Sequence, residues 1–253
     1  MLNIAKDIAD LPNGESFIIF LGQAGFAFKS AAGTLIGLDL YLSDCVAEYD
    51  KYKRLMPYIL EPDEIAFDAL IATHAHYDHF DYGSMAQLME NGATKLYASH
   101  NCESEVLKLN MKNDGITYVK AGDTAVFRDI KLEFVFCDHG KSAPDAVGVV
   151  IDIDGKLVYI AGDTCLRLDK VSEITKGRTF DIMIAPINGA FGNLNEVEAV
   201  KLCEAVKPKI IIPCHFWNFA EHHGDPGKFI EETENKLPGQ KYTLMRMGEI
   251  SPL

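Results

Sequence analysis

The segment His74-Ala75-His76-Tyr77-Asp78-His79 constrains the fold of this chain more than any other stretch. It places three histidines and one aspartate within six residues, shortly after the apolar run 69–72. Such a run predicts a buried β-strand whose end delivers the cluster into a loop. In extended backbone His74 and His76 point the same way, while Asp78 and His79 continue into a turn. The fold must therefore leave this strand end open to further polar groups.

The residue types in this segment favour a metal-binding loop. Imidazole nitrogens and carboxylate oxygens are ligands that zinc, manganese and iron take from proteins. The alternative is a solvated histidine-rich loop, which we consider weaker because so many ligands in one peptide rarely arise without a metal. One short peptide of this kind could serve two adjacent ions.

Three other strand-like runs end next to single polar residues. The runs 132–137, 157–161 and 210–214 lead to His139, Asp163 and His215. Folds of the α/β type gather their chemistry just past the ends of strands. Each residue alone could equally be a satisfied core or loop residue. Together with the first cluster they give five histidines and two aspartates, enough for two metal ions that share a bridging carboxylate and a water.

Two further residues compete for these positions. His100 follows a strand-like run, yet the residues after it predict a helix, so we interpret 99–101 as the helix cap. The tetrapeptide Ala-Gly-Asp-Thr occurs at 121–124 and again at 161–164. The first copy precedes a new strand and is better interpreted as a turn. Asp163, in the second copy, follows a hairpin signalled by Asp154-Gly155.

The pattern of these residues resembles the metallo-β-lactamase superfamily. Its signature is H-x-H-x-D-H, followed by a His, an Asp and a His in that order. The resemblance spans nearly the whole chain, because 22–26 and 35–39 are similar to the opening hairpin region and the early structural Asp of that fold. The family order favours His139, which lies in a strand-end His-Gly pair, over His100. It also favours Asp163, which comes after the third histidine.

Within the superfamily the chain looks most like the branch that contains the L-ascorbate-6-phosphate lactonases. The segments that carry this narrower resemblance are Arg54-Leu55-Met56-Pro57 with Glu61-Pro62-Asp63-Glu64, Ala185-Pro186-Ile187-Asn188-Gly189, and His215 followed by Asp225-Pro226. The region 218–223 departs from the pattern of these lactonases.

The resemblance and the strand pattern together imply one α/β (α+β) domain over residues 1–253, a four-layer αββα sandwich with the ligand loops along one edge. We expect strands near 16–20, 24–29, 33–38, 68–72, 95–99, 116–119, 124–127, 130–137, 146–153, 156–161, 180–184, 209–214 and 241–246. We expect helices near 3–10, 81–91, 101–110, 166–176, 194–206 and 226–236. The segment 41–64 is interpreted as a long functional loop.

The expected activity is hydrolysis by a hydroxide that bridges two divalent ions. The first ion would be held by His74, His76 and His139, the second by Asp78, His79 and His215, with Asp163 as the bridge. The ions would lower the pKa of the bridging water from about 15.7 toward about 7. Asp78 would hold the hydroxide and shuttle its proton. The lactonase resemblance implies manganese, with zinc or iron as alternatives. The oxygen-reducing di-iron relatives carry a carboxylate in place of His76, which argues against a redox role.

The expected substrate is a small anionic molecule, namely a lactone of a phosphorylated sugar acid such as L-ascorbate 6-phosphate. Arg54 would grip the phosphate through two hydrogen bonds, although it could be an ordinary surface arginine. Asn188 and His223 are candidate substrate contacts, with a turn and a solvated loop as their respective alternatives. A phosphodiesterase acting on small anionic esters or cyclic nucleotides is the second hypothesis. A metal-stabilised binding module is the third.

Composition limits the class of partner. The net charge is −13 and the basic residues are not clustered, so we expect no nucleic acid partner. Six scattered cysteines without a C-x-x-C pair indicate buried thiols in a reducing cytoplasm. The segment 1–6 predicts the start of a short helix rather than a signal peptide, and no apolar run is long enough to span a membrane. The sequence leaves a homo-oligomer open.

Overall fold

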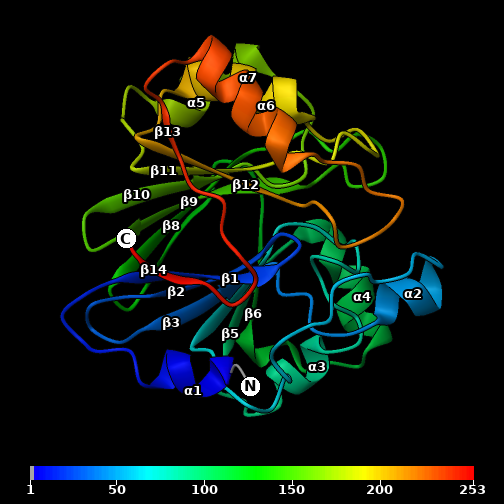
Figure 1. Ribbon diagram of the computed structural model, residues 1–253. Helices are drawn as coiled ribbons and strands as arrows, with labels where there is room; N and C mark the ends of the chain where they lie inside the picture. The colour runs from blue at the N-terminus through cyan, green and yellow to red at the C-terminus, as the bar shows by residue number, and fades with distance from the viewer. Residues whose placement is uncertain (1–2) are drawn as a thin grey trace.

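Two β-sheets of seven strands each pack face to face in the computed structural model, which describes residues 3–253 (Figure 1). The first sheet contains, in spatial order, β14 (Ile250–Pro252), β1 (Phe17–Gly22), β2 (Gly25–Lys29), β3 (Leu35–Leu38), β4 (Ala69–Ala72), β5 (Lys95–Ser99) and β6 (Ile116–Val119). The second contains β13 (Lys241–Tyr242), β12 (Ile210–Cys214), β11 (Ile182–Pro186), β10 (Lys156–Ile160), β9 (Val147–Ile153), β8 (Ile130–Phe136) and β7 (Thr124–Phe127).

Helices cover the outer face of each sheet (Figure 1). The first sheet is covered by α1 (Ile4–Ala9), α3 (Met85–Leu88) and α4 (Glu103–Lys108), and the second by α5 (Val171–Thr175), α6 (Glu196–Val206) and α7 (Pro226–Lys236). A further short helix, α2 (Cys45–Tyr49), lies in the segment between β3 and β4. The predicted four-layer αββα sandwich is confirmed.

Several central strands, among them β1, β4, β11 and β12, are apolar along nearly their whole length because both faces of the sheet are covered there. In β1, Ile18 and Phe20 face the core between the sheets, whereas Phe17, Ile19 and Leu21 face the helices. Successive strand side chains point to opposite faces, so one strand supplies both cores. This double burial explains why the sequence shows continuous apolar runs and not a polar alternation.

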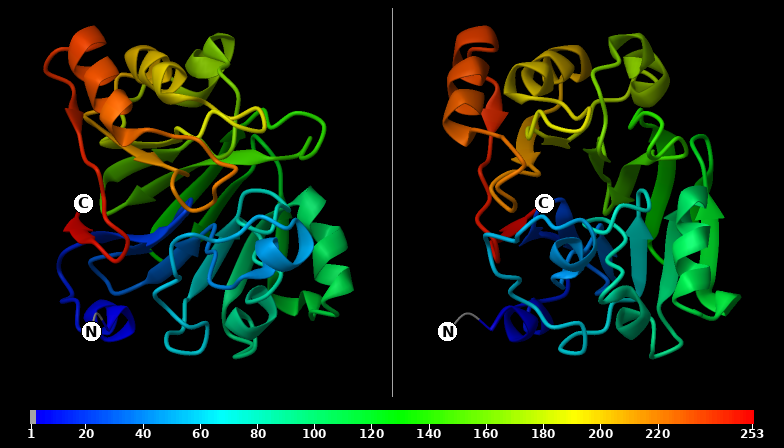
Figure 2. Two further views of the ribbon diagram at one scale, coloured as in Figure 1. Left: turned by 45° about the vertical axis from the view of Figure 1, so that its right-hand side comes forward. Right: turned by 90° about the vertical axis from the view of Figure 1, so that its right-hand side faces the viewer.

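The strand ends that carry the predicted ligands all belong to the interior of the two sheets. Strands β3 to β6 run parallel, as do β10 to β12, and parallel strands end at the same edge. The chain leaves β12 in a loop that meets the segment after β3, where Arg54 and Phe219 form an isolated antiparallel bridge. Figure 2 shows this contact as the orange loop beside the cyan one.

The predicted elements are confirmed with a few corrections. The predicted helix 81–91 is shorter, since only Met85–Leu88 is helical, and the helices predicted at 101–110 and 166–176 both start as 3₁₀ turns. The predicted strand 241–246 ends at Tyr242, and β14 and α2 were not expected. The predicted amino-terminal helix is present as α1; Met1 and Leu2 lie outside the described residues.

The predicted hairpin turn is confirmed, and a capping box begins the helix predicted near 194–206. Asp154 and Gly155 both have positive φ angles, +50° and +75°, as a two-residue hairpin turn between β9 and β10 requires. Asn195 caps α6, because its side chain accepts a hydrogen bond from the Glu198 backbone N–H and the Glu198 carboxylate accepts one from the Asn195 backbone N–H. Within residues 3–253, no helix has the length and apolar character needed to cross a bilayer.

Candidate metal centre

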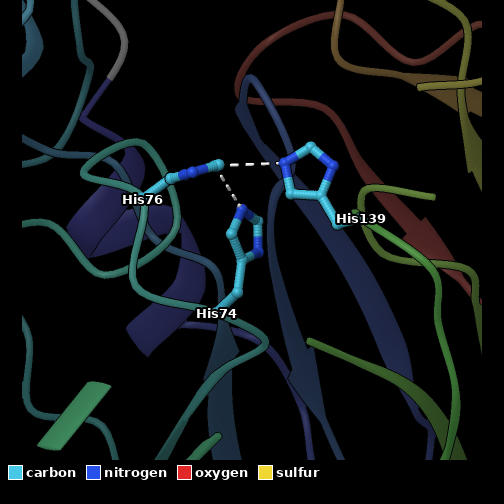
Figure 3. Close-up of side chains that lie close together, drawn as sticks. All are labelled: His74, His76 and His139. Atoms are coloured by element: carbon cyan, nitrogen blue, oxygen red, sulfur yellow. Dashed lines mark hydrogen bonds between the residues drawn. The ribbon is translucent and has the colours of Figure 1, made fainter. Parts of the chain in front are cut away.

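Three histidines from two loops meet at the edge between the sheets. His74 and His76 follow β4, and His139 follows β8. The Nδ1 atom of His76 lies 3.0 Å from Nε2 of His74 and 3.1 Å from Nε2 of His139 (Figure 3). Burial lowers the pKa of all three imidazoles, to about 4 for His139, so the rings are neutral at pH 7.

This histidine cluster fits a metal ion. His76 Nδ1 faces two ring nitrogens but holds either one proton or one lone pair, so it cannot make a full hydrogen bond to both of them. A cation placed among the three nitrogens would accept all three lone pairs. The donor set of three neutral imidazoles therefore matches a transition metal better than it matches a hydrogen-bonded core.

A second group lies beside the first. The Nε2 atom of His215 is 3.2 Å from Asp78 Oδ2, 3.2 Å from His79 Nε2 and 3.2 Å from Asp163 Oδ2. Asp163 also approaches both groups, because its Oδ1 lies 3.4 Å from His79 Nε2 and its Oδ2 lies 3.8 Å from His139 Nε2. The structure thus brings all seven predicted ligands together, with Asp163 between the two groups.

The electrostatics of the second group call for positive charge. Burial alone would raise the pKa of Asp163, but His215 and His79 outweigh it and hold the pKa well below its usual range. Burial alone would lower the pKa of His215, yet the Asp163 and Asp78 carboxylates raise it to about 9. Two buried carboxylates therefore stay ionised and need either protons on the imidazoles or divalent cations beside them.

Buried residues behind the ligands fix the orientation of their rings. Asp39 is 1% exposed, and its Oδ2 lies 2.8 Å from His79 Nδ1. Its carboxylate also accepts hydrogen bonds from the backbone and the hydroxyl of Thr73, and that hydroxyl lies 3.1 Å from Nδ1 of His74. A carboxylate on the far nitrogen of a histidine selects the tautomer that leaves Nε2 free for a metal.

Gln23 is a site residue that sequence reasoning missed. It sits in the turn between β1 and β2 with φ +54°, and its side chain is buried. Its Nε2 donates to Asp78 Oδ2 at 2.8 Å and lies 3.2 Å from His215 Nε2 and 3.3 Å from His222 Nδ1. Its Oε1 has no hydrogen-bond partner among the described residues. The only signal in the sequence was a polar residue between Gly22 and Ala24 in an apolar hairpin.

His222 takes the position that the sequence analysis gave to His223. The His222 ring stacks on His215 with centroids 4.8 Å apart, and its nitrogen lies close enough to Asp78 and His215 to share an ion with them. His223 is exposed and does not line the pocket. The candidate therefore moves from His223 to its neighbour His222, because adjacent side chains in an irregular loop point in different directions.

Arg54 holds a loop and does not reach the pocket, which corrects its predicted role as a phosphate anchor. Its side chain is 6% exposed, and its guanidinium donates to the carbonyls of Tyr41 at 2.9 Å and Ser43 at 2.7 Å. The guanidinium also lies 3.7 Å from the centre of the Tyr41 ring and 3.2 Å from Asp44. These contacts engage the Nε and Nη2 donors of the guanidinium.

The remaining candidates lie away from the ligands. Asn188 is fully buried outside the pocket lining, its amide has no partner among the described residues, and its backbone bridges to Asn195. His100 and Asp123, which the sequence analysis set aside, lie outside the cavity lining. His100 is exposed against Tyr118, Asp123 accepts a hydrogen bond from a turn, and Cys214 faces the core between the sheets.

A cavity of about 240 Å³ opens in front of the ligands. One side is formed by the ligand groups, and the other by Val46, Asp50, Tyr52, Ser142, Phe191 and Phe219. The described residues that line it include no lysine and no arginine. The arrangement offers two adjacent candidate ion positions next to a small cavity that is partly lined by aromatic side chains.

Comparisons with known proteins agree with this geometry. A family model described as a beta-lactamase superfamily domain matches residues 41–216. A UPF0173 metal-dependent hydrolase of Aeropyrum pernix is 28% identical over 249 residues, which cover 92% of this chain and 95% of the relative. A UPF0173 metal-dependent hydrolase of Thermococcus onnurineus is 29% identical over 243 residues, covering 92% and 98%.

Solved structures share the fold. Igni18, a metallo hydrolase of the archaeon Ignicoccus hospitalis, superimposes with a TM-score of 0.77 at 21% identity, covering 94% of this chain and 98% of its own. The metallo-beta-lactamase fold protein YhfI of Bacillus subtilis gives a TM-score of 0.71 at 14% identity, covering 95% and 100%.

Proposed function

The chain belongs to the metallo-β-lactamase superfamily, and from that membership we propose a metal-dependent hydrolase that opens a small lactone with two divalent ions. One observation carries the two-ion proposal: the Asp163 carboxylate lies within 3.8 Å of His139 on one side and within 3.4 Å of His79 and His215 on the other. A carboxylate in this position suits a bridge between two ions.

The ions would supply two things when bound, a Lewis acid for the substrate carbonyl and a nucleophile from water at neutral pH. The ligands are nitrogen and oxygen atoms, which suits manganese, zinc or iron. The lactonase resemblance favours manganese. Buried free cysteines, with Cys165 alone half-buried, support our proposal of a reducing cytoplasm as the place of action.

Asp78 is the residue of this chain best suited to handle the proton. Its side chain is 13% exposed and lines the cavity, where it can accept a hydrogen bond from a water. Burial alone would raise its pKa, but His79 and His215 hold that pKa well below the usual range. The carboxylate is therefore ionised at pH 7 and free to take a proton and return it to the leaving oxygen.

Gln23 and Asp39 would position this machinery without contacting the reacting atoms. Gln23 donates to the oxygen of Asp78, which fixes the carboxylate orientation. Asp39 orients His79 from behind. Such supporting contacts usually matter nearly as much as the ligands themselves.

The narrower proposal of a phosphorylated sugar lactone rests on sequence resemblance. The lactone part agrees with a hydrolytic site beside a small cavity. The phosphate part lacks the predicted partner, because Arg54 is committed to backbone carbonyls. Phosphodiester hydrolysis needs the same ions and remains the second candidate, although it too would bring an anion into a cavity lined by Asp50.

A substrate panel on manganese- and zinc-loaded protein tests the proposal. Lactones should be hydrolysed faster than phosphodiesters, and Asp78→Asn should abolish the rate while the protein stays folded. Cys214→Ser serves as the control, because this thiol faces the core between the sheets. Lactone hydrolysis that survives Asp78→Asn, or that is lost in a folded Cys214→Ser protein, would contradict the mechanism.

A further inference from the structure

A row of aromatic rings extends from the ligand His215 to the opposite side of the cavity. Tyr52 stacks on Phe191 with ring centroids 5.7 Å apart and an interplanar angle of 28°. Phe191 lies 5.5 Å from His222, and His222 lies 4.9 Å from Phe219. All four residues line the cavity, and they come from three separate loops. The rings form one continuous wall, here called the aromatic wall.

The backbone of Phe191 is in a strained conformation. Its side chain is 55% exposed, although phenylalanine is normally buried. Its φ angle is +54°, in the left-handed region that a residue with a side chain rarely adopts. Strain of this kind is found where surrounding contacts hold a residue for a function. An exposed ring over the cavity mouth is a surface on which an apolar or flat group can rest.

The charge of the lining disfavours an anion on this side of the cavity. Asp50 is the charged residue among those that face the ligands, and Lys and Arg are absent from the described lining. The guanidinium of Arg54 is held by the carbonyls of Tyr41 and Ser43. A phosphate or carboxylate against this wall would lie near the Asp50 carboxylate, with no lysine or arginine of the described lining beside it.

We propose that the substrate is an uncharged molecule whose flat or apolar portion lies against the aromatic wall, with its electrophilic carbon toward the ligand cluster. The inference rests on the proposed hydrolytic function and narrows its substrate class. The cavity volume of about 240 Å³ limits the occupant to a small molecule. Stacking on aromatic rings and burial of apolar area supply the binding, and the ligand side supplies the chemistry.

A matched pair of substrates tests this inference on the full-length, metal-loaded protein. The two are six-membered lactones of the same ring, one carrying a phenyl group and the other a carboxyphenyl group. The phenyl lactone should show a kcat/KM at least tenfold higher. Phe191→Ala should lower that value by roughly tenfold, mainly through KM, with metal content unchanged by elemental analysis. Asp50→Asn should reduce the ratio of kcat/KM for the phenyl lactone to kcat/KM for the carboxyphenyl lactone.

The control is Leu107→Ala, which removes another exposed apolar side chain, 64% exposed on α4, outside the cavity lining. It should leave both lactones as in the wild type. Equal or faster turnover of the carboxyphenyl lactone would overturn the inference. Identical kinetics of Phe191→Ala and Leu107→Ala would overturn it as well.

A binding measurement separates this inference from the proposed function. The corresponding phenyl and carboxyphenyl lactams resist ring opening, so calorimetric titration gives their affinity without turnover. Tighter binding of the phenyl lactam, weakened by Phe191→Ala, supports the inference even where neither lactone is hydrolysed and the proposed function fails. Hydrolysis of both lactones at equal rates would leave the function in place and remove the inference.

Discussion

Asp39 orients His79, a ligand of the proposed second ion, from outside the cavity. Its carboxylate lies against Nδ1 of His79 and also accepts two hydrogen bonds from Thr73. Because the amide in Asp39→Asn has lost the charge that orients the imidazole, we expect the affinity for one of the two ions to fall about 10–100-fold. Chelator competition, followed by the fluorescence of the single tryptophan, Trp217, would measure this change.

The matched control for Asp39→Asn is Glu204→Gln, which removes a carboxylate from the exposed face of α6. It should leave both ion affinities as in the wild type. An Asp39→Asn protein that binds both ions normally would show that His79 needs no orienting carboxylate.

The clustering of the seven candidate ligands could be predicted because each is a coordinating residue placed just past an apolar strand, and both properties are local. Gln23 and His222 could not be found in the same way. Gln23 reaches the site only because the turn after β1 lies against β12, where the Gln23 carbonyl accepts a hydrogen bond from the His215 backbone. Which of His222 and His223 lines the cavity depends on the path of the loop that carries both, and the sequence does not show that path. Arg54 matched a sequence segment, but its partners, the carbonyls of Tyr41 and Ser43, are tertiary contacts.

Asp81 joins the loop after β3 to the loop that carries the first ligands. It is fully buried and accepts hydrogen bonds from the Leu42 backbone at 2.7 Å, the Gly83 backbone at 3.0 Å and the Ser43 hydroxyl. In Asp81→Ala these three donors lose their acceptor, and that of Leu42 is buried. We expect the free energy of unfolding to fall by roughly 2–4 kcal/mol. Urea denaturation of the variant would measure it.

The comparison for Asp81→Ala is Glu204→Ala, at an exposed helical position where the change should stay within about 0.5 kcal/mol. Equal stabilities of the two variants would show that Asp81 does not hold the loops together. A loss of stability together with a loss of bound metal is expected, because His79 lies two residues from Asp81.

A surface ion pair links the end of α5 to β8. Burial alone would raise the pKa of Glu133, but its contacts with Lys176 and Arg178 lower it. A folded-state pKa below the unfolded value means that the pair stabilises the protein at neutral pH and is lost as the pH falls through the folded pKa. With partners 56% and 32% exposed, the contribution is at most about 1 kcal/mol.

Glu133→Gln should therefore lower the melting temperature slightly at pH 7 and leave it unchanged below the ordinary glutamate pKa of about 4.3, once the folded pKa has also been passed. Thermal unfolding at a series of pH values would measure both. An effect that grows toward acid pH would reverse the assigned sign.

Most helices and strands could be predicted because their apolar pattern is long enough to be read locally. Two elements could not. Strand β14 has three residues and exists because it pairs with the edge of β1, where Phe17 lies opposite Pro252. Helix α2 has five residues and is held by Cys45 and Val46 against Phe219, far along the chain. Short elements of this kind depend on contacts that a sequence pattern does not contain.

The two sheets share one core, and the molecule should therefore unfold as one unit. Phe26 and Phe28 of β2 lie in the same buried cluster as Phe134 of β8 and Ile151 of β9. With metal concentration held fixed, Trp217 fluorescence and far-ultraviolet circular dichroism should give the same urea midpoint. Phe134→Ala should lower both midpoints together, with a loss of about 3–5 kcal/mol. Separate midpoints would show that the halves fold independently.

The central claim is that seven residues from four strand ends hold two divalent ions. Elemental analysis of protein prepared with ample metal tests it most directly, and the result should be about two ions per chain. His74→Ala should lose one ion, and Asp163→Ala should lose most of both, because its carboxylate borders both groups. Wild-type protein without bound metal, or two folded variants with unchanged metal content, would contradict the account.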